Sequence, residues 1–234
     1  MSFSFKLLGN AANTTHEVDA VHSAARTSAY PQTVGARGTY AASFTTGIIA
    51  AGLGANSEIF QFRFVHASYF ALLRSVRISA AVSTTGFAAG VPPTIEMKIA
   101  RAWTAQGTLG TGITWGTNDG KKRTDFATTV LGSGDVRIAT TVALGAGTKT
   151  LDGTAAASVV GNTAGGGGAA PATQIISPGT VLWARDTSDE WPFLFENQEG
   201  FVLRSVQIPP TGTWTATVQV EWAEVDPAVI LGWT

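Results

Sequence analysis

Apolar and polar side chains alternate without a break from Thr213 to Trp222. The apolar set is Trp214, Ala216, Val218, Val220 and Trp222, and the polar set is Thr213, Thr215, Thr217, Gln219 and Glu221. Because successive side chains of a strand point to opposite faces of a sheet, this pattern predicts an antiparallel strand with only one face in a core. The chain must therefore supply further strands to pair with this one and another layer to cover its apolar face.

A second apolar run, from Phe201 to Ile208, comes just before this strand. The two runs are separated by Pro209-Pro210-Thr211-Gly212, and proline and glycine are the residues that most favour turns. Two strands joined by so short a turn commonly pair with each other. We therefore predict a β-hairpin made of residues 201–208 and 213–222.

Short strand-like segments recur along the rest of the chain, separated by turns rich in glycine and proline. They cover residues 39–46, 58–65, 69–82, 95–103, 136–144 and 175–184. The side chains of Phe60, Phe62 and Phe64 recur at every second position, which places them on one face of their strand. We predict an all-β fold, an antiparallel β-sandwich, and the chain length and long insertions favour a jelly-roll-like arrangement over the smaller immunoglobulin type.

The expected domain organisation has three parts. Residues 1–34 form an N-terminal arm with a short strand, residues 35–226 form a single sandwich domain, and residues 227–234 form an apolar C-terminal docking tail. Two long polar insertions interrupt the sandwich. We expect residues 104–135 to be a surface loop or a partner-facing insertion, and residues 145–174, which include the run Gly165–Gly168, to be a glycine-rich loop.

The chain carries unusually little charge. Charged residues are 13% of the sequence, about half of the ~25% that is typical of globular proteins. We expect a homo-oligomer, with a trimer favoured, because a surface with so little charge is poorly protected against association; the alternative is a monomer that merely has few charges. The formal net charge of −1 argues against a nucleic-acid partner. No apolar run is long enough for a transmembrane helix, so we expect no membrane partner.

Residues with catalytic or metal-binding potential are few and poorly spaced. The chain has no cysteine, which excludes thiolate chemistry, and His16 and His22 match no standard metal-ligand spacing. Asp186, Asp189 and Glu190 would suit a loop-type calcium site or simply an exposed acidic turn. The carboxylates considered for glycosidase chemistry are Glu196, Glu199, Glu221 and Glu224. Since no acid–base set stands out, we predict no catalytic residues, no metal, no cofactor and no enzymatic activity.

Both termini are apolar, although chain ends are usually polar unless they are held in place. The residues that we expect to bind a partner are Phe3, Phe5, Leu7, Leu8, Val229, Ile230, Leu231 and Trp233. They would insert into a neighbouring subunit or shell, or else into the chain's own core. A different kind of contact is stacking of an exposed tryptophan on a sugar ring, for which Trp115 is the main candidate.

One further set of strand-forming segments is residues 55–64 (Ala-Asn-Ser-Glu-Ile-Phe-Gln-Phe-Arg-Phe), 76–80 (Val-Arg-Ile-Ser-Ala), 135–140 (Asp-Val-Arg-Ile-Ala-Thr), 197–201, 212–214 and 220–224. Together these segments resemble a family of tailed-bacteriophage and viral-metagenome virion proteins. The resemblance implies a non-enzymatic virion structural protein, made and assembled in the host cytoplasm, that binds the phage capsid or other virion proteins. Within that class we expect a capsid decoration or cement protein; the alternative is a module of the tail or fibre that binds host surface glycans.

Overall fold

The computed structural model describes residues 5–6, 15–16, 36–50, 53–87, 92–162, 174–185, 192–208 and 211–227. The chain divides into two compact units, Met1–Val34 and Gly35–Thr234. In the first unit, β1 (Phe5–Lys6) pairs antiparallel with β2 (Thr15–His16). All other described strands belong to the second unit.

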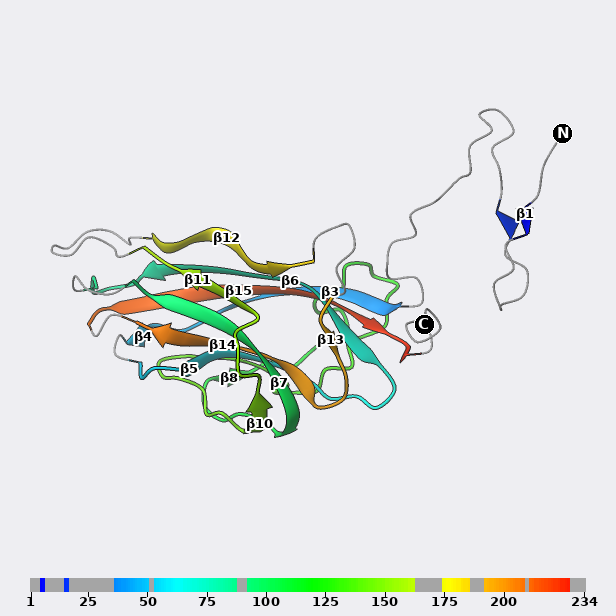
Figure 1. The fold of residues 1–234 in the computed structure, drawn as a ribbon, viewed down its shortest axis with the longest axis horizontal. Coiled ribbons are helices and arrows are strands. Elements are labelled where there is room, and N and C mark those ends of the chain that lie inside the picture. The colour runs from blue at the N-terminus through cyan, green and yellow to red at the C-terminus, as the bar shows by residue number, and fades with distance from the viewer. Residues whose placement is uncertain are drawn as a thin grey trace, which may run out of the picture. The chain divides into compact units, whose positions relative to one another are not determined.

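Two antiparallel sheets pack face to face in the second unit (Figure 1). The six-stranded sheet contains β3 (Ala36–Thr45), β4 (Ile49–Ala50), β6 (Phe70–Val82), β12 (Gln174–Ala184), β13 (Leu194–Phe195) and β15 (Thr213–Val225). The seven-stranded sheet contains β5 (Ser57–Phe64), β7 (Thr94–Ala105), β8 (Thr111–Gly112), β9 (Val136–Ile138), β10 (Thr148–Leu151), β11 (Ala157–Val160) and β14 (Glu199–Gln207). The predicted all-β antiparallel sandwich is confirmed.

The order of the strands is that of a jelly roll. The long strands of the six-stranded sheet lie in the order β12-β6-β15-β3, and the core of the other sheet runs β7-β14-β5, with β11 paired to the free side of β7. Numbered along the chain as β3, β5, β6, β7, β11, β12, β14 and β15, these strands give the orders 1-8-3-6 and 2-7-4-5. Most connections therefore cross from one sheet to the other, as in the two Greek keys of a jelly roll.

The core lies between the sheets and is rich in aromatic rings. All five apolar side chains of the alternating segment in β15 are buried, and Phe60, Phe62 and Phe64 of β5 are fully buried opposite them. The ring of Trp222 stacks on Tyr40 at a centroid distance of 5.3 Å and meets the Phe62 ring at 5.5 Å. The predicted inward faces of these strands are thus correct, and each large ring buries ~150–250 Å² of surface.

The predicted hairpin of residues 201–208 and 213–222 is wrong. β14 pairs with β5 and β7 in one sheet, whereas β15 pairs with β3 and β6 in the other. The connection between them crosses from sheet to sheet at the end of the sandwich. Both strands keep an inward apolar face, so their alternation is the same whether they pair side by side or face each other across the core.

The insertion at 145–174 contains strands that the sequence analysis did not predict. β10 and β11 both pair antiparallel with β7, and residues 163–173 lie outside the described residues. The strand predicted over 136–144 is shorter, because β9 ends at Ile138. In β12, Pro178 and Gly179 form a bulge within one strand rather than a turn between two, and the register with β6 shifts between Ile176 and Thr180.

Residues from the insertion at 104–135 lie along β3, the last strand of the six-stranded sheet. The backbone N–H of Ala41 donates to the carbonyl of Gly120 at 2.7 Å, and the N–H of Lys122 donates to the carbonyl of Thr39 at 2.9 Å. The side chain of Lys122 also forms an ion pair with Glu221 of β15, at 2.7 Å. This insertion is therefore a structural part of the sheet's border.

Candidate functional site

The outer face of the seven-stranded sheet is covered by the chain itself. Val202 lies between the inward-facing Phe201 and Leu203, so its side chain points outwards, yet it is fully buried. It packs there with Ala100 and Trp103 in a small second cluster, against which Leu151 of β10 also packs. β10 and β11 are edge strands of this same sheet, beside β7. Residues 145–153 also contact the outward-facing side chains of Gln61 and Lys98, and we call this covering segment the third layer.

A buried ionic cluster lies under this third layer. The Nζ of Lys149 is 2.9 Å from each carboxylate oxygen of Glu58 and 4.6 Å from the centre of the Trp103 ring. The amide nitrogen of Gln61 donates to Oε2 of Glu58 at 2.5 Å. Only 3% of the Lys149 side chain and 6% of that of Glu58 are exposed. Burial lowers the pKa of Lys149, while the hydrogen bond and charge of Glu58 oppose that shift.

Two further charged side chains on this side of the sheet have partners within the chain, one in the third layer and one in the sheet itself. The Nζ of Lys98 donates to the carbonyls of Asp152 and Gly153 at 3.0 and 2.7 Å, and Arg204 of β14 pairs with Glu96 of β7. Several of the chain's few charges are therefore used inside the protein and do not contribute to its outer surface.

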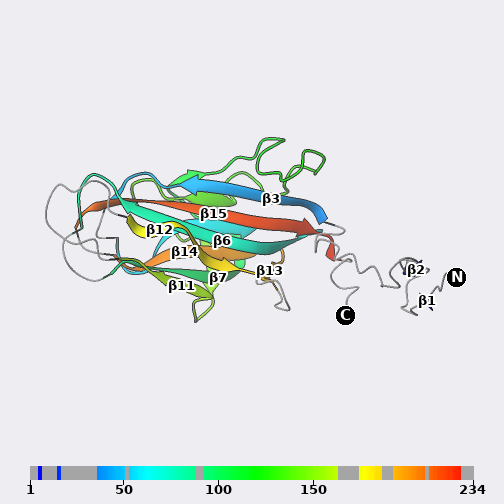
Figure 2. The same ribbon diagram turned by 90° about the horizontal axis from the view of Figure 1, so that it is seen from above.

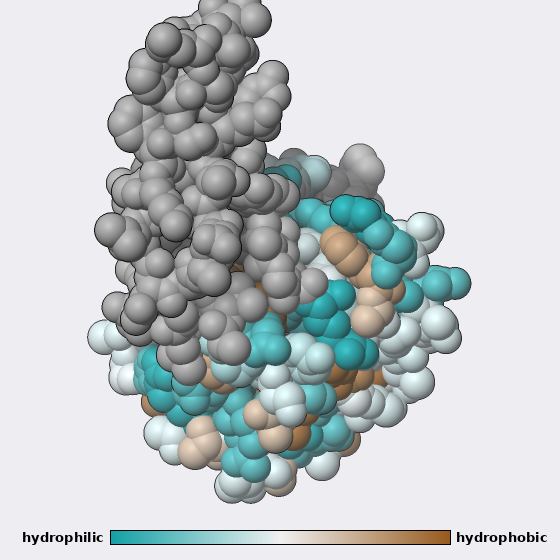
Figure 3. All heavy atoms as spheres, turned by 90° about the vertical axis from the view of Figure 1, so that its right-hand side faces the viewer, coloured by the Kyte–Doolittle hydropathy of each residue, from teal (hydrophilic) through white to brown (hydrophobic). Residues whose placement is uncertain are grey.

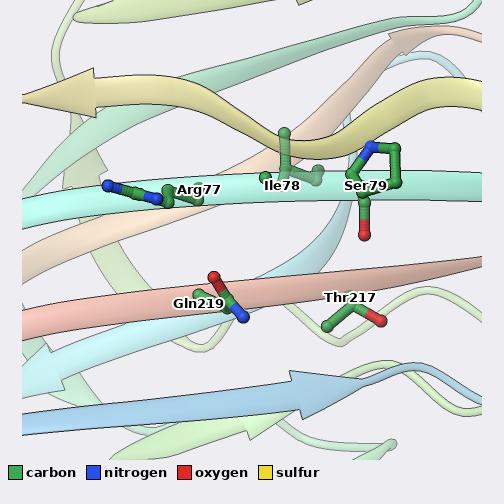
Figure 4. A pocket seen from close by; sticks show the side chains of 7 residues that line it. Arg77, Ile78, Ser79, Thr217 and Gln219 are labelled. Carbon is green, nitrogen blue, oxygen red and sulfur yellow. The ribbon is translucent and has the colours of Figure 1, made fainter.

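The outer face of the six-stranded sheet, which Figure 2 views from above, is different. The polar residues at its centre are exposed or intermediate in burial. Cross-strand neighbours form two rows: Ser43, Gln219 and Arg77 in one, and Thr45, Thr217 and Ser79 in the other. Figure 4 shows the members of these rows that lie on β6 and β15. We call these six residues the open face.

A shallow hollow of about 140 Å³ lies on the open face, beside the bulge in β12. It is lined by Arg77, Ile78, Ser79, Pro178, Gly179, Thr217 and Gln219 (Figure 4). The hydroxyl groups of Thr45 and Thr217 are 3.0 Å apart and already bond to each other. The side chains that line the hollow thus offer one guanidinium, one amide and two hydroxyl groups, which suits hydrogen bonding to a partner. None of them is a base that could activate a neighbouring nucleophile.

The surface at the end of the sandwich where β15 ends is mixed in character. Figure 3 shows hydrophilic and near-neutral side chains there, with small hydrophobic areas between them. Close to this end, Leu72, Ala223 and Val225 form a buried cluster with the partly buried Phe70 and Leu194. Ala223 lies between two inward-facing residues, so this cluster is on the outer side of the sheet.

Three of the four carboxylates considered for glycosidase chemistry, those of Glu199, Glu221 and Glu224, are held in separate interactions. Glu224 is fully buried and accepts hydrogen bonds from the backbone of Val130 at 3.1 Å and from the hydroxyl of Thr129. Burial raises its pKa, and those hydrogen bonds partly oppose the shift. Glu199 pairs with Arg101 at 3.0 Å, Glu221 lies on the opposite face of β15 from Glu224, and the backbone N–H of Glu196 donates to Glu199.

Trp115, the predicted sugar-stacking residue, is half-buried. Its ring meets those of Phe44 and Trp222 edge-on, at centroid distances of 6.1 and 5.5 Å. Its indole nitrogen is buried and has no hydrogen-bond partner among the described residues. Of the other tryptophans, Trp103 is in the interior and Trp183 packs on Phe193. The glycan role of Trp115 stays a prediction.

Most residues of the predicted docking termini lie outside the described residues. These are Phe3, Leu7, Leu8, Val229, Ile230, Leu231 and Trp233. Phe5 is opposite His16 in the β1–β2 pair. The acidic residues Asp186, Asp189 and Glu190, considered for calcium, are also outside the described part.

The open face combines residues that the sequence analysis found with residues that it missed. Thr217 and Gln219 belong to the polar half of the alternating segment, so their outward position was predicted. Arg77 and Ser43 were not singled out, since only the pairing register brings them into one row with Gln219. The alternation of side chains in β6 predicts that Arg77 points to the outer face. No signal in the sequence indicates that Gln219 lies beside it on the next strand.

No group of three or more potential metal ligands occurs within the described ranges. The same part of the chain contains no helix long and apolar enough to cross a membrane. Comparisons with protein-family models, with curated proteins and with solved structures found no match for this chain.

Proposed function

We propose that this chain is a non-enzymatic structural protein of a tailed-bacteriophage virion, most specifically a capsid decoration or cement protein. In this role it associates with copies of itself, with a trimer favoured, and with the capsid. The observation that carries the proposal is the contrast between the two outer faces: one is partly covered by residues 145–153 of the chain itself, whereas the centre of the other is exposed or only partly buried.

The size of the open side of the sandwich supports a stable contact. Four strands at ~4.8 Å spacing and ~10 residues long at ~3.3 Å per residue cover roughly 600 Å². A standard specific interface buries ~800 Å² on each partner, so this face would supply most of one. Arg77 is the one charged member of its two central rows, and few charges have to lose their water when it is covered.

The fold is compatible with this role, because jelly rolls are common in viral capsid proteins. Jelly rolls also occur in lectins and in other proteins, so the fold alone does not identify the function. The open face and the low charge therefore support the proposed virion role more strongly than the jelly-roll topology does.

Light scattering coupled to gel filtration tests the self-association. The full chain is expected to elute as a homo-oligomer at micromolar concentration, and Thr217→Arg is expected to shift it to monomers by placing a bulky cation on the open face. Val160→Arg is the control, since Val160 is 62% exposed on the other side of the sandwich. A wild-type monomer, or equal effects of the two variants, would contradict the proposed interface.

The virion assignment has its own test. Purified particles of the phage that encodes the chain are expected to contain it in many copies, measurable by mass spectrometry, with its density on the capsid in a particle map. Absence from purified particles would refute the assignment even if the chain is oligomeric in solution.

A further inference from the structure

The Glu58–Lys149–Gln61 cluster brings together an amine, a carboxamide and a carboxylate in a place closed to solvent. One carboxylate oxygen, Oε2 of Glu58, accepts hydrogen bonds from both the Lys149 amine at 2.9 Å and the Gln61 amide at 2.5 Å. The amine and the carboxamide therefore lie next to each other across one shared atom. Gln61 is fully buried, and its carbonyl oxygen Oε1 has no hydrogen-bond partner among the described residues.

The backbone around Lys149 holds this geometry. The Gln61 amide also donates to the carbonyl of Gly145 at 3.0 Å, and the Lys149 amine donates to the carbonyl of Ala146. The Trp103 ring closes the cluster on another side, 4.6 Å from the amine. Since β5 supplies Glu58 and Gln61 while β10 supplies Lys149, the cluster joins the third layer to the sheet beneath it.

We propose that Lys149 and Gln61 become joined by an isopeptide bond after the chain folds, with Glu58 as the proton-transfer group. The Lys149 ammonium gives a proton to the Glu58 carboxylate, and the neutral amine attacks Cδ of Gln61. The new bond is Nζ–Cδ, and the bond that breaks is Cδ–Nε2. The second proton of the amine passes to the leaving nitrogen, so ammonia departs and Glu58 ends as a neutral carboxylic acid.

The environment favours each part of this step. A free carboxamide is a poor electrophile, but fixed neighbours react as if at very high concentration, with effective molarities of ~10⁵–10⁸ M in well-oriented cases. A proton-transfer group within hydrogen-bond reach of both nitrogens adds general acid–base catalysis. Burial lowers the pKa of Lys149, which makes the neutral amine more accessible.

The product also resolves two unfavourable features of the cluster. The reaction removes a buried ion pair, whose desolvation is costly. The carboxylic acid left at Glu58 is a hydrogen-bond donor, and Oε1 of the neighbouring Gln61 is an acceptor without a partner among the described residues. A covalent link between β5 and β10 would in addition hold the third layer in place, independently of whether the chain decorates a capsid.

Intact-mass and peptide mass spectrometry of the full-length protein test the proposal. The wild type is expected to be lighter than its sequence by one ammonia, to give a branched tryptic peptide that contains both Gln61 and Lys149, and to resist cleavage after Lys149. Lys149→Arg keeps a cation beside Glu58 and Trp103 but has no amine nucleophile. Glu58→Gln keeps the size of the side chain and removes the proton acceptor. Both variants are expected to lose the branched peptide, and circular dichroism checks that they fold.

Lys98→Arg is the matched control, because Lys98 is also buried under the third layer but donates only to backbone carbonyls in the described contacts. It is expected to keep the ammonia loss and the branched peptide. The proposal is overturned if folded wild-type protein, after prolonged incubation at neutral pH, retains its full mass and is cleaved after Lys149. It is equally overturned if the ammonia loss persists in Lys149→Arg and maps to another residue.

Discussion

Replacing Thr129 by valine removes a hydrogen bond to the buried Glu224 while leaving the volume of the side chain almost unchanged. The Thr129 hydroxyl donates to the Glu224 carboxylate and accepts from the backbone N–H of Leu131 at 3.2 Å. Glu224 is in β15, and Thr129 is in the insertion that lies along β3. The substitution therefore tests how strongly that insertion is attached to the sheet.

The expected cost follows from these contacts. A hydrogen bond to a charged group contributes ~1.5–3 kcal/mol, and leaving the N–H of Leu131 without an acceptor adds about 1 kcal/mol. Thr129→Val is thus expected to lower the free energy of unfolding by about 3 kcal/mol at pH 7, measured by urea denaturation. Thr45→Val is the control: its hydroxyl bonds to Thr217 on the exposed face, so its cost should stay within about 0.5 kcal/mol.

The loss of stability caused by Thr129→Val should also depend on pH, and the burial of Glu224 determines whether it grows or shrinks as the pH rises. Burial raises the pKa of Glu224 above its ordinary value of 4.5, so its contribution to stability is fully present below that value and is lost as the pH rises through the raised pKa. Removing Thr129, whose hydrogen bond lowers this pKa, raises it further. The difference between wild type and Thr129→Val is therefore expected to be larger at pH 8 than at pH 4.

A double-mutant cycle decides whether the reasoning holds. In the Glu224→Gln background the lost hydrogen bond is between neutral groups and contributes only about 1 kcal/mol, while the Leu131 N–H still loses its acceptor, so Thr129→Val should cost about 2 kcal/mol there. The account is refuted if the substitution costs the same in both backgrounds, or if its cost grows as the pH falls.

Three further substitutions probe other parts of the sandwich. Trp115→Ala should lower stability by about 2 kcal/mol in thermal or urea unfolding, less than a fully buried tryptophan, because the ring is only half-buried against the core; an unchanged stability would contradict its packing role. Gly200→Ala should cost about 3 kcal/mol in urea unfolding, since its Cβ would lie 1.9 Å from a carbonyl oxygen of β5, whereas Gly153→Ala has open space and should be neutral. Lys122→Ala should cost less than 1 kcal/mol at low salt and still less at high salt, because its ion pair with Glu221 is exposed; a larger, salt-independent cost would contradict this.

The sequence predicted which side chains face inwards better than it predicted which strands are neighbours. Alternation in β15 and β5 follows from the twofold repeat of a strand, and the buried sets agree with it. The hairpin prediction for 201–208 and 213–222 failed because alternation carries no information on pairing partners. In a jelly roll, consecutive strands often belong to opposite sheets, and a short turn can cross between them.

The third layer was missed for a different reason. β10 and β11 are short strands in which each residue, counted with its backbone, is exposed or intermediate in burial, so they lack the apolar repeat that identifies a core strand. Gln61 alternates with the inward-facing phenylalanines, which places it on the outer face of β5, but the sequence does not reveal that a distant segment covers it there. The buried ionic cluster was invisible for the same reason.

The two borders of the six-stranded sheet limit how copies of this chain could join. Along β3, residues 120–122 already occupy backbone groups, and β12 on the other side is distorted at Pro178, which has no N–H to donate. A neighbour that approached edge to edge would find little continuous backbone to pair with. Strand-to-strand growth into open-ended fibrils is therefore disfavoured. Copies are instead expected to contact one another through the broad faces of their sheets, and a rotation axis between such contacts gives a closed oligomer with a fixed number of subunits.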